Sequence, residues 1–407
     1  MSRFPKTSET FIVRELDALD RRGQWEVGLR SLFGSPEPAA VHPVAVRWAA
    51  AVRRPRAAGV ARGLCWALRR APRALFGVLC VVVREHARHP AALARALVTV
   101  ALATGHAREL AGEPGVRIHA HFATYPALAA WVCHRLAGVR YGFTAHAHDL
   151  YVDRTMLAAK VEAADYVVTV SEFNRRLLAG IPGAPDTPVH VVRCGIDSGH
   201  YPFRARAVPC TGPVRALCVA SLEGYKGHRV LFEALALGGP GVDRVELRLV
   251  GDGPLRQELA ELATSSGLGR RVRFLGRRSE LEVRRLLAAA DLFVLPSVVA
   301  DNGQMEGLPV ALIEALASGV PTVSTALSGI PEIVLDGVTG LLARPGSARS
   351  LRDTLERAIA DVQGAPWRAR AGRDLVESRF ELESSIDELL TVLGGDALGV
   401  ASLGGPR

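Results

Sequence analysis

The sequence of 407 residues contains few lysines and few aromatic residues. Lysine occurs three times, at Lys6, Lys160 and Lys226, so the formal charge of +9 comes almost entirely from arginine. Such a bias can follow from codon usage, and the charge alone therefore does not indicate an anionic partner. Aromatic residues make up 6% of the chain and do not alternate with basic ones, as they do on nucleic-acid-binding surfaces. We expect no nucleic-acid partner.

The six cysteines form no C-x-x-C pair, which argues against a zinc site or a disulfide framework and favours a reducing compartment. The longest apolar run, residues 74–83, is too short to cross a bilayer. Residues 1–6 lack the apolar stretch of a signal peptide. We therefore expect a cytoplasmic protein that is either free in solution or peripheral at the cytoplasmic membrane.

The length of the chain and its alternation of apolar segments predict an α/β protein of two domains. In the first half, short apolar runs at residues 115–122, 141–145 and 166–170 predict buried strands. In the second half, a helical pattern at residues 228–237 and an apolar run at 292–295 predict a parallel sheet with helical crossovers.

One stretch of the second half carries a functional signal. Residues 305–321 read as a loop with Glu306, followed by an apolar helix that contains Glu314 and ends at Gly319. Free N–H groups at the start of such a helix can bind a pyrophosphate. The carboxylates would then accept hydrogen bonds from hydroxyl groups, Glu314 from a ribose and Glu306 from a sugar ring. Taken alone, two glutamates around an apolar helix are more typical of a capped amphipathic helix.

Two His-x-His units follow predicted strands of the first half. They are His119-Ala-His121 and His146-Ala-His148, the second with Asp149 directly after it. Paired histidines with an aspartate can bind zinc, so a metal-dependent hydrolase is one interpretation. No later array of His or Asp completes a metal shell, and we expect no metal site.

Several segments together resemble glycosyltransferase family 4, and in particular its branch in exopolysaccharide and colanic acid biosynthesis. Segments similar to the donor-site signature of that family are residues 295–297 (LPS), 306–309 (EGLP), 314–315 (EA) and 318–321 (SGVP). Segments that resemble its first loop and helix, its acceptor-side loop and its diphosphate loop are residues 8–12 (SETFI), 143–149 (FTAHAHD) and 220–227 (ASLEGYKG).

The resemblance implies roles for individual residues. Lys226 would steady the donor diphosphate, Glu306 would contact the sugar hydroxyls, and His146 would hold the transferred sugar. Ser221 stands where the family commonly has an arginine, and what replaces that arginine stays open. The other donor-binding residues that it implies are Gly307, Leu308, Pro309 and Glu314. The residues that it implies on the acceptor side are Ser8, Glu9, Thr10, His121, Asp149, Ser171 and Asn174.

The resemblance also implies a fold of two Rossmann-like domains facing a cleft, which is the GT-B arrangement. Residues 1–200 would form the acceptor-binding domain, in which the first strand is missing, so that the start of the chain looks shortened. The remaining parts would be a linker at 201–213, the donor-binding domain at 214–366, a helix at 367–393 that crosses back to the first domain, and a disordered tail at 394–407.

The implied reaction transfers a hexosyl unit from a nucleotide-diphosphate sugar to a hydroxyl of a lipid-linked or saccharide acceptor, with retention and without a metal or other cofactor. The implied setting is the biosynthesis of a surface polysaccharide or exopolysaccharide. The sequence does not choose between UDP and GDP, nor does it identify the sugar or the oligomeric state. Three alternatives stay open: a nucleotide-sugar epimerase of the same fold, an inactive sugar-nucleotide-binding module, and the metal-dependent hydrolase.

Overall fold

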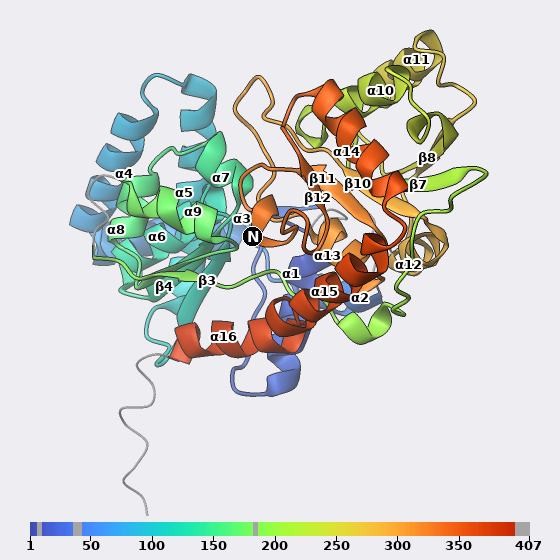
Figure 1. Ribbon diagram of the computed structural model, residues 1–407. Coiled ribbons are helices and arrows are strands. Elements are labelled where there is room, and N and C mark those ends of the chain that lie inside the picture. The colour runs from blue at the N-terminus through green and yellow to red at the C-terminus, as the bar shows by residue number, and fades with distance from the viewer. Residues whose placement is uncertain (6–9, 36–42, 182–185, 395–407) are drawn as a thin grey trace, which may run out of the picture. The chain divides into compact units, whose positions relative to one another are not determined.

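The computed structural model describes residues 1–5, 10–35, 43–181 and 186–394, and the chain divides into two compact units (Figure 1). Unit 1 takes the residues up to Val192 and those from Ile386 on, and unit 2 takes residues 193–385. Each unit contains a parallel sheet with helices between its strands. The α/β class and the two parallel sheets agree with the prediction from the sequence.

The sheet of unit 1 has four parallel strands in the order β3-β4-β5-β6. The strands are β3 (Arg117–His121), β4 (Arg140–Ala145), β5 (Tyr166–Thr169) and β6 (Val189–Val191). Parallel strands are covered on both faces, which explains why all four residues of β5 are apolar or small and buried. The register pairs His121 with Thr144, so the carboxyl ends of β3 and β4 meet at one edge of the sheet.

The helices of unit 1 pack closely because small residues lie where they cross. A Cβ atom at Gly63 of α3 would lie 2.5 Å from the backbone nitrogen of Gly105 in α5, so only glycine permits this approach.

Nine helices precede unit 2 in the described chain: α1 (Thr10–Arg22), α2 (Pro43–Ala51), α3 (Ala57–Arg70), α4 (Pro72–His86), α5 (Pro90–Leu110), α6 (Tyr125–Ala137), α7 (Ala147–Tyr151), α8 (Leu157–Glu162) and α9 (Glu172–Ala179).

A short strand that the sequence did not indicate precedes the first helix, although the four-stranded sheet of unit 1 takes no strand from this part of the chain. A two-residue strand β1 (Arg3–Phe4) pairs in parallel with β2 (Phe33–Gly34) in a sheet of its own. The backbone N–H groups of Leu32 and Phe33 donate to the carbonyl groups of the first two residues at 3.0 and 2.9 Å, and Phe4 is buried. The hydrogen bonds come from a distant part of the chain, which no local sequence pattern reveals.

The sheet of unit 2 has six parallel strands in the order β12-β11-β10-β7-β8-β9. They are β7 (Val214–Val219), β8 (Val245–Val250), β9 (Val272–Gly276), β10 (Leu292–Leu295), β11 (Thr322–Thr325) and β12 (Leu341–Ala343). From β9 to β12 this is the 3-2-1-4-5-6 order of a doubly wound sheet. The order reverses between β7 and β10, and ligands of such sheets bind in the crevice beyond the carboxyl ends of the strands at that point.

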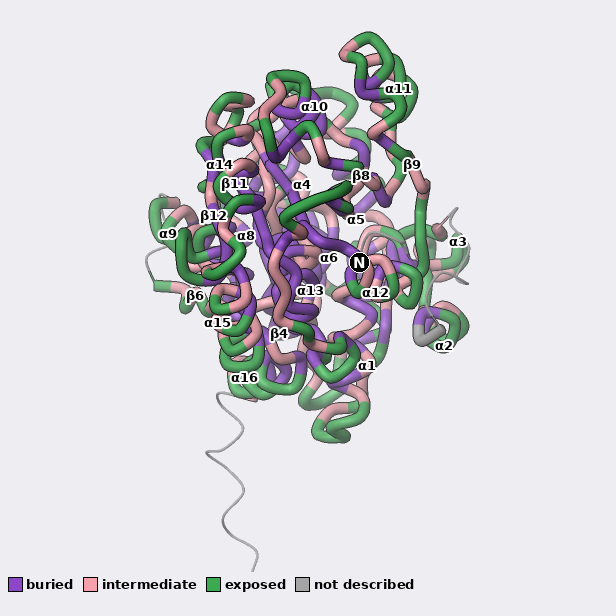
Figure 2. The backbone as a smooth tube through the Cα atoms, turned by 45° about the vertical axis from the view of Figure 1, so that its right-hand side comes forward, coloured by how far each residue is buried: buried purple, intermediate pink, exposed green. Residues whose placement is uncertain are grey.

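Helices α10 to α13 lie between successive strands of unit 2, and α14 and α15 follow the last strand. They are α10 (His228–Ala236), α11 (Arg256–Ser265), α12 (Glu280–Ala289), α13 (Val310–Ala317), α14 (Ala348–Ala360) and α15 (Gly364–Arg379). Figure 2 shows that α13 is mostly buried, whereas the outer helices, such as α11, alternate buried and exposed residues. None of the described helices combines the length and the apolar character that crossing a bilayer requires.

The segment expected as one helix over residues 367–393 consists of two. Helix α15 ends at Arg379, and α16 (Leu382–Gly394) begins after a break at which Ile196 exchanges backbone hydrogen bonds with Phe380 and Leu382, both at 2.9 Å. From Ile386 on, α16 belongs to unit 1, where the carbonyl of Leu393 accepts a hydrogen bond from Arg117 at 2.6 Å. The predicted tail beyond residue 394 lies outside the described residues.

Candidate active site

Two loops of unit 2 bring Lys226 and Glu306 together at the point where the strand order reverses. The loop after β7 carries Lys226, and the loop after β10 carries Glu306. The ammonium group of Lys226 donates directly to Oε2 of Glu306, and the side chains are only 13% and 12% exposed. The topology therefore places these two residues of the predicted donor site in the crevice that doubly wound sheets use for ligands.

Backbone contacts fix the position of the lysine. Lys226 ends the short 3-10 helix η4 (Gly224–Lys226), and Gly227 follows with a φ of +73°. A Cβ atom at Gly227 would lie 1.9 Å from the carbonyl oxygen of Pro296, so glycine is required both for the conformation and for the space. The N–H of Val298 also donates to the carbonyl of Tyr225 at 2.9 Å, which holds the two loops side by side.

The charge of Lys226 is maintained despite its burial. Burial by itself lowers the pKa of Lys226, but the carboxylate of Glu306 and the side chain of Tyr225 outweigh that effect and raise the pKa above its ordinary value. The lysine is thus a cation whose ion-pair partner is the largely buried carboxylate of Glu306, and a diphosphate could take the place of that carboxylate.

The Glu306 loop leads directly into helix α13, and hydrogen bonds to its backbone hold it in place. The hydroxyl of Ser328 donates to the backbone carbonyl oxygens of Glu306 and, at 3.2 Å, of Gly307. Gly307, Leu308 and Pro309 are buried, and Pro309 is the residue before the helix. These three residues therefore have little contact with solvent, and a ligand could meet them through their backbone.

Glu314 has a partner that the sequence did not reveal. It is 8% exposed, and its Oε1 accepts a hydrogen bond of 2.8 Å from the hydroxyl of Tyr201. The guanidinium of Arg284 lies 5.5 Å from the centre of the Tyr201 ring. Tyr201 lies in the segment predicted as a linker, which carried no signal for a role in the site. Ser221, in the loop after β7, is half-buried.

In unit 1, His121 and His146 meet at the edge formed by the ends of β3 and β4. Their ring centres are 6.0 Å apart and nearly parallel, and Phe122 lies 4.7 Å from His146. Burial lowers the pKa of His146 to about 3, so its imidazole is neutral near pH 7. Its Nε2 atom is buried without a hydrogen-bond partner among the described residues, and a ligand hydroxyl could supply one.

Glu15 of α1 joins this group, and the sequence did not indicate it. Its Oε1 lies 3.0 Å from Nε2 of His121. Burial alone would raise the pKa of Glu15, but the neighbouring imidazoles, His121 foremost, hold it below its ordinary value. Phe11, one turn earlier on the same helix, lies 5.3 Å from His146. A helical wheel of α1 places these two residues on one face, which was the available signal.

Glu15, His119 and His121 are also a group that could hold a metal ion, because their ligand atoms lie within 4.8 Å of one another. Both ring nitrogens of His119 already have partners, since Nδ1 lies 3.0 Å from the Tyr166 hydroxyl and Nε2 lies 2.8 Å from the Thr144 hydroxyl. Metal binding would have to displace one of these hydroxyls. The proximity of these ligand atoms, with Glu15 in place of Asp149, thus leaves the metal-binding interpretation open, while the partners of His119 oppose it.

The other predicted acceptor-side residues form the frame of this edge. Asp149 is fully buried and accepts from the backbone N–H groups of Ala123 and His146 at 2.8 and 2.9 Å, and burial raises its pKa to about 6. Ser171 is the N-cap of α9 and accepts from the N–H of Asn174 at 3.2 Å. Thr10 begins α1, whereas Ser8 and Glu9 lie outside the described residues. Direct contact of these residues with an acceptor stays a prediction.

Comparison with known proteins agrees with this geometry. “Glycosyltransferase Family 4” matches residues 108–200, and “Glycosyl transferases group 1” matches residues 204–372. The amylovoran biosynthesis glycosyltransferase AmsK of Erwinia amylovora is 36% identical over 214 residues, which are 52% of this chain and 52% of AmsK. This match spans only about half the length of that relative.

Two further similarities extend over more of the chain. The GDP-mannose-dependent alpha-(1-6)-phosphatidylinositol monomannoside mannosyltransferase of Mycolicibacterium smegmatis is 30% identical over 323 residues, covering 76% of this chain and 83% of that one. The crystal structure of Anabaena Alr3699/HepE in complex with UDP and glucose has a TM-score of 0.65 and 19% identity, with 96% of both chains covered.

Two α/β units with parallel sheets, the second in doubly wound order, define a protein of the GT-B fold class. Within that class, the chain belongs to glycosyltransferase family 4. The fold class and the family that the sequence predicted are both confirmed.

Proposed function

We propose that the protein transfers a hexosyl unit from a nucleotide-diphosphate sugar to a hydroxyl of a lipid-linked or saccharide acceptor, with retention, in the biosynthesis of a surface polysaccharide or exopolysaccharide. The observation that carries the proposal is the buried pair of Lys226 and Glu306 at the strand-order reversal of unit 2. Family membership and the names of the relatives support it, since they mention amylovoran biosynthesis and GDP-mannose, and HepE was crystallised with UDP and glucose.

In the proposed reaction the donor diphosphate takes the place of Glu306 beside the Lys226 ammonium group. The bond between the anomeric carbon and the phosphate oxygen breaks as the acceptor oxygen bonds to that carbon on the same face. The acceptor proton passes to the departing phosphate oxygen. Lys226 and the backbone N–H groups ahead of α13 stabilise the charge that develops on the leaving group.

The released Glu306 carboxylate then accepts hydrogen bonds from sugar hydroxyls, and Glu314 accepts from the ribose. His146 holds the transferred sugar in place. Positioning and electrostatic stabilisation thus account for the chemistry that this chain's residues supply. We propose that the reaction requires no metal and takes place in the cytoplasm, either in solution or at the membrane face.

The test is to measure the release of nucleotide from UDP-linked and GDP-linked hexoses, with and without a chelator. One donor should be consumed with or without chelator, and addition of an acceptor should increase the rate. Interconversion of the sugar without acceptor would favour an epimerase, and nucleotide binding without turnover would favour an inactive binding module. Loss of activity with chelator would favour a metal-dependent enzyme that uses Glu15, His119 and His121.

Two substitutions separate binding from turnover. Glu314→Ala should weaken donor binding, because the ribose loses its acceptor, whereas Glu306→Ala should mainly lower the turnover number. Calorimetric titration with the nucleotide and steady-state kinetics measure the two quantities. If both variants match the unsubstituted protein in affinity and rate, the assignment of this site is wrong.

A further inference from the structure

Residues 43–110, which carry none of the family's motifs, contain all the excess positive charge of the chain. The segment has twelve arginines and two glutamates, a formal charge of +10, while the rest of the chain sums to −1 of the total +9. Codon usage would distribute arginine along the whole sequence without excluding acidic residues from one segment. The local imbalance therefore calls for a physical explanation at the surface of helices α3, α4 and α5.

The two acidic residues of this segment do not neutralise its arginines as a group. Glu85 pairs with its neighbour Arg84 at 3.1 Å, and Glu109 pairs with Arg30 from outside the segment. Arg69, Arg70 and Arg108 form no ion pair with any described residue. Their side chains are exposed to solvent, so their guanidinium groups are available to an anionic partner.

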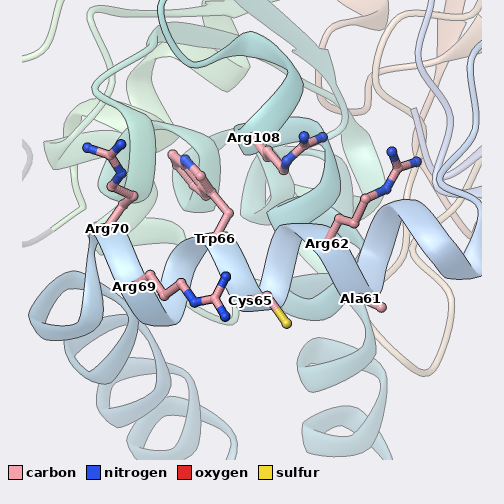
Figure 3. A pocket seen from close by; sticks show the side chains of 7 residues that line it. All are labelled: Ala61, Arg62, Cys65, Trp66, Arg69, Arg70 and Arg108. Atoms are coloured by element: carbon pink, nitrogen blue, oxygen red, sulfur yellow. The ribbon is translucent and has the colours of Figure 1, made fainter.

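Four arginines surround a shallow hollow of about 630 Å³ on α3 and α5. Figure 3 shows Arg62, Trp66 and Arg70 on the side of α3 where Arg108 of α5 lies, with Arg69 on the near side of the helix. Gly63 permits the close approach of α3 and α5, which brings the arginines of the two helices to one hollow. Several guanidinium groups around one hollow match the phosphate oxygens of a headgroup.

Exposed apolar side chains lie on the same helices as these arginines. Helix α3 buries Gly63 and Ala67 against its neighbours, yet Leu68 is 61% exposed. Helix α4 buries Leu75, Val78 and Val82, yet Phe76 is 70% exposed and Val83 is 45% exposed. Phe76, Cys80 and Val83 recur at helical spacing, so they form a stripe on the solvent side of α4, with Arg73 and Arg84 beside it.

We propose that the α3–α4 surface and the arginine hollow form a binding site for the phosphate-bearing headgroups of an anionic lipid bilayer. Arginines beside exposed Leu and Phe side chains on helices are the pattern of a surface that lies in the bilayer interface. The exposed aliphatic side chains favour lipid over a nucleic acid, because bases could stack on Phe76 but would leave Leu68 and Val83 in contact with water. This proposal depends on the proposed function in one respect: binding to the bilayer brings the enzyme to a lipid-linked acceptor.

The test measures cosedimentation of the whole protein with vesicles, without donor or acceptor. The vesicles are phosphatidylcholine alone or phosphatidylcholine with phosphatidylglycerol. The protein should bind only the anionic vesicles, and added salt should release it. Arg69→Gln/Arg70→Gln should weaken binding on the order of thirty-fold, and Leu68→Ser/Phe76→Ser should weaken it about ten-fold.

Matched control variants change exposed residues of unit 2. Arg285→Gln/Arg349→Gln removes two exposed arginines, and Leu237→Ser removes a side chain that is 54% exposed, so both should bind vesicles like the unsubstituted protein. Equal binding to both kinds of vesicle, salt-independent binding, or unchanged binding of the arginine variant would overturn the proposal. So would binding of a labelled RNA, lost in the arginine variant, without binding to vesicles. Turnover with a water-soluble acceptor tests the transfer reaction separately.

Discussion

At the scale of single residues, Lys226 and Glu306 form a buried pair whose members depend on each other. Taking two charges out of water is costly, and their attraction compensates for that cost only while both are present. The same two residues would have to separate when a diphosphate enters. The free energy of this contact therefore contributes both to the stability of unit 2 and to its affinity for a donor.

Removing one member of this pair should destabilise the protein more than removing both. Lys226→Met leaves the Glu306 carboxylate buried without a cation and should lower the free energy of unfolding by about 3 kcal/mol. Lys226→Met/Glu306→Gln should recover most of that loss and remain inactive. Arg229→Met, which breaks an exposed pair with Glu258, should change stability by about 0.5 kcal/mol or less. Urea denaturation measures all three, and equal losses in the single and double variants would contradict the dependence.

At the scale of secondary structure, the crossing of α3 and α5 depends on Gly63. Gly63→Ala would place a methyl group 2.5 Å from the backbone of α5 and should destabilise unit 1 by about 2 kcal/mol, because the two helices must move apart. Gly59→Ala on the same helix meets nothing within 4 Å and should stabilise it by about 0.5 kcal/mol. Hydrogen exchange of the α3 and α5 amides distinguishes the two, and faster exchange in both variants would be inconsistent with this account.

The sequence predicted the elements whose signals are local. The apolar run at residues 292–295 matches β10 to the residue, and the helix predicted at 228–237 is α10 within one residue of its end. The prediction failed where a segment far away along the chain determines the local secondary structure. Strand β1 exists because β2 supplies its hydrogen bonds, and the break between α15 and α16 exists because Ile196 bonds to both sides of it.

The candidate site was predicted to a similar extent. The motif around Glu306 and the loop around Lys226 pointed to residues that the structure brings into contact. Glu15 and Tyr201 were missed because each lies in a segment whose pattern is that of an ordinary helix or linker. Their partners, His121 and Glu314, are far away in the sequence, so only the folded chain shows the pairs.

At the scale of the whole molecule, each unit contains a neutral buried histidine that is not among the predicted site residues. In unit 1, burial and the charge of Arg30 lower the pKa of His106 to about 4. In unit 2, burial and the charge of Lys226 lower the pKa of His228 to about 4. An unfolded chain binds these protons near pH 6.5, so the folded state binds fewer protons between about pH 4 and 6.5.

The free energy of unfolding should therefore fall as the pH drops below about 6.5, by up to about 1.4 kcal/mol per pH unit for each of these histidines. The contribution of the histidines should reach a constant value below about pH 4. Thermal unfolding followed by circular dichroism between pH 7 and pH 5 measures the fall. His106→Gln should reduce the slope relative to the unsubstituted protein. A melting temperature that stays constant from pH 7 to pH 5 would show that these histidines are not held neutral.

The concentration of charge in residues 43–110 has one more consequence for the molecule as a body. With +10 in residues 43–110 and −1 elsewhere, the positive charge is concentrated on one group of helices of unit 1, and so uneven a distribution acts as an electric dipole. Near any negatively charged plane, a dipole experiences a torque as well as an attraction. The protein should thus approach such a plane already turned, with α3 and α4 leading, and it should be retained on a cation-exchange matrix more strongly than its total charge implies.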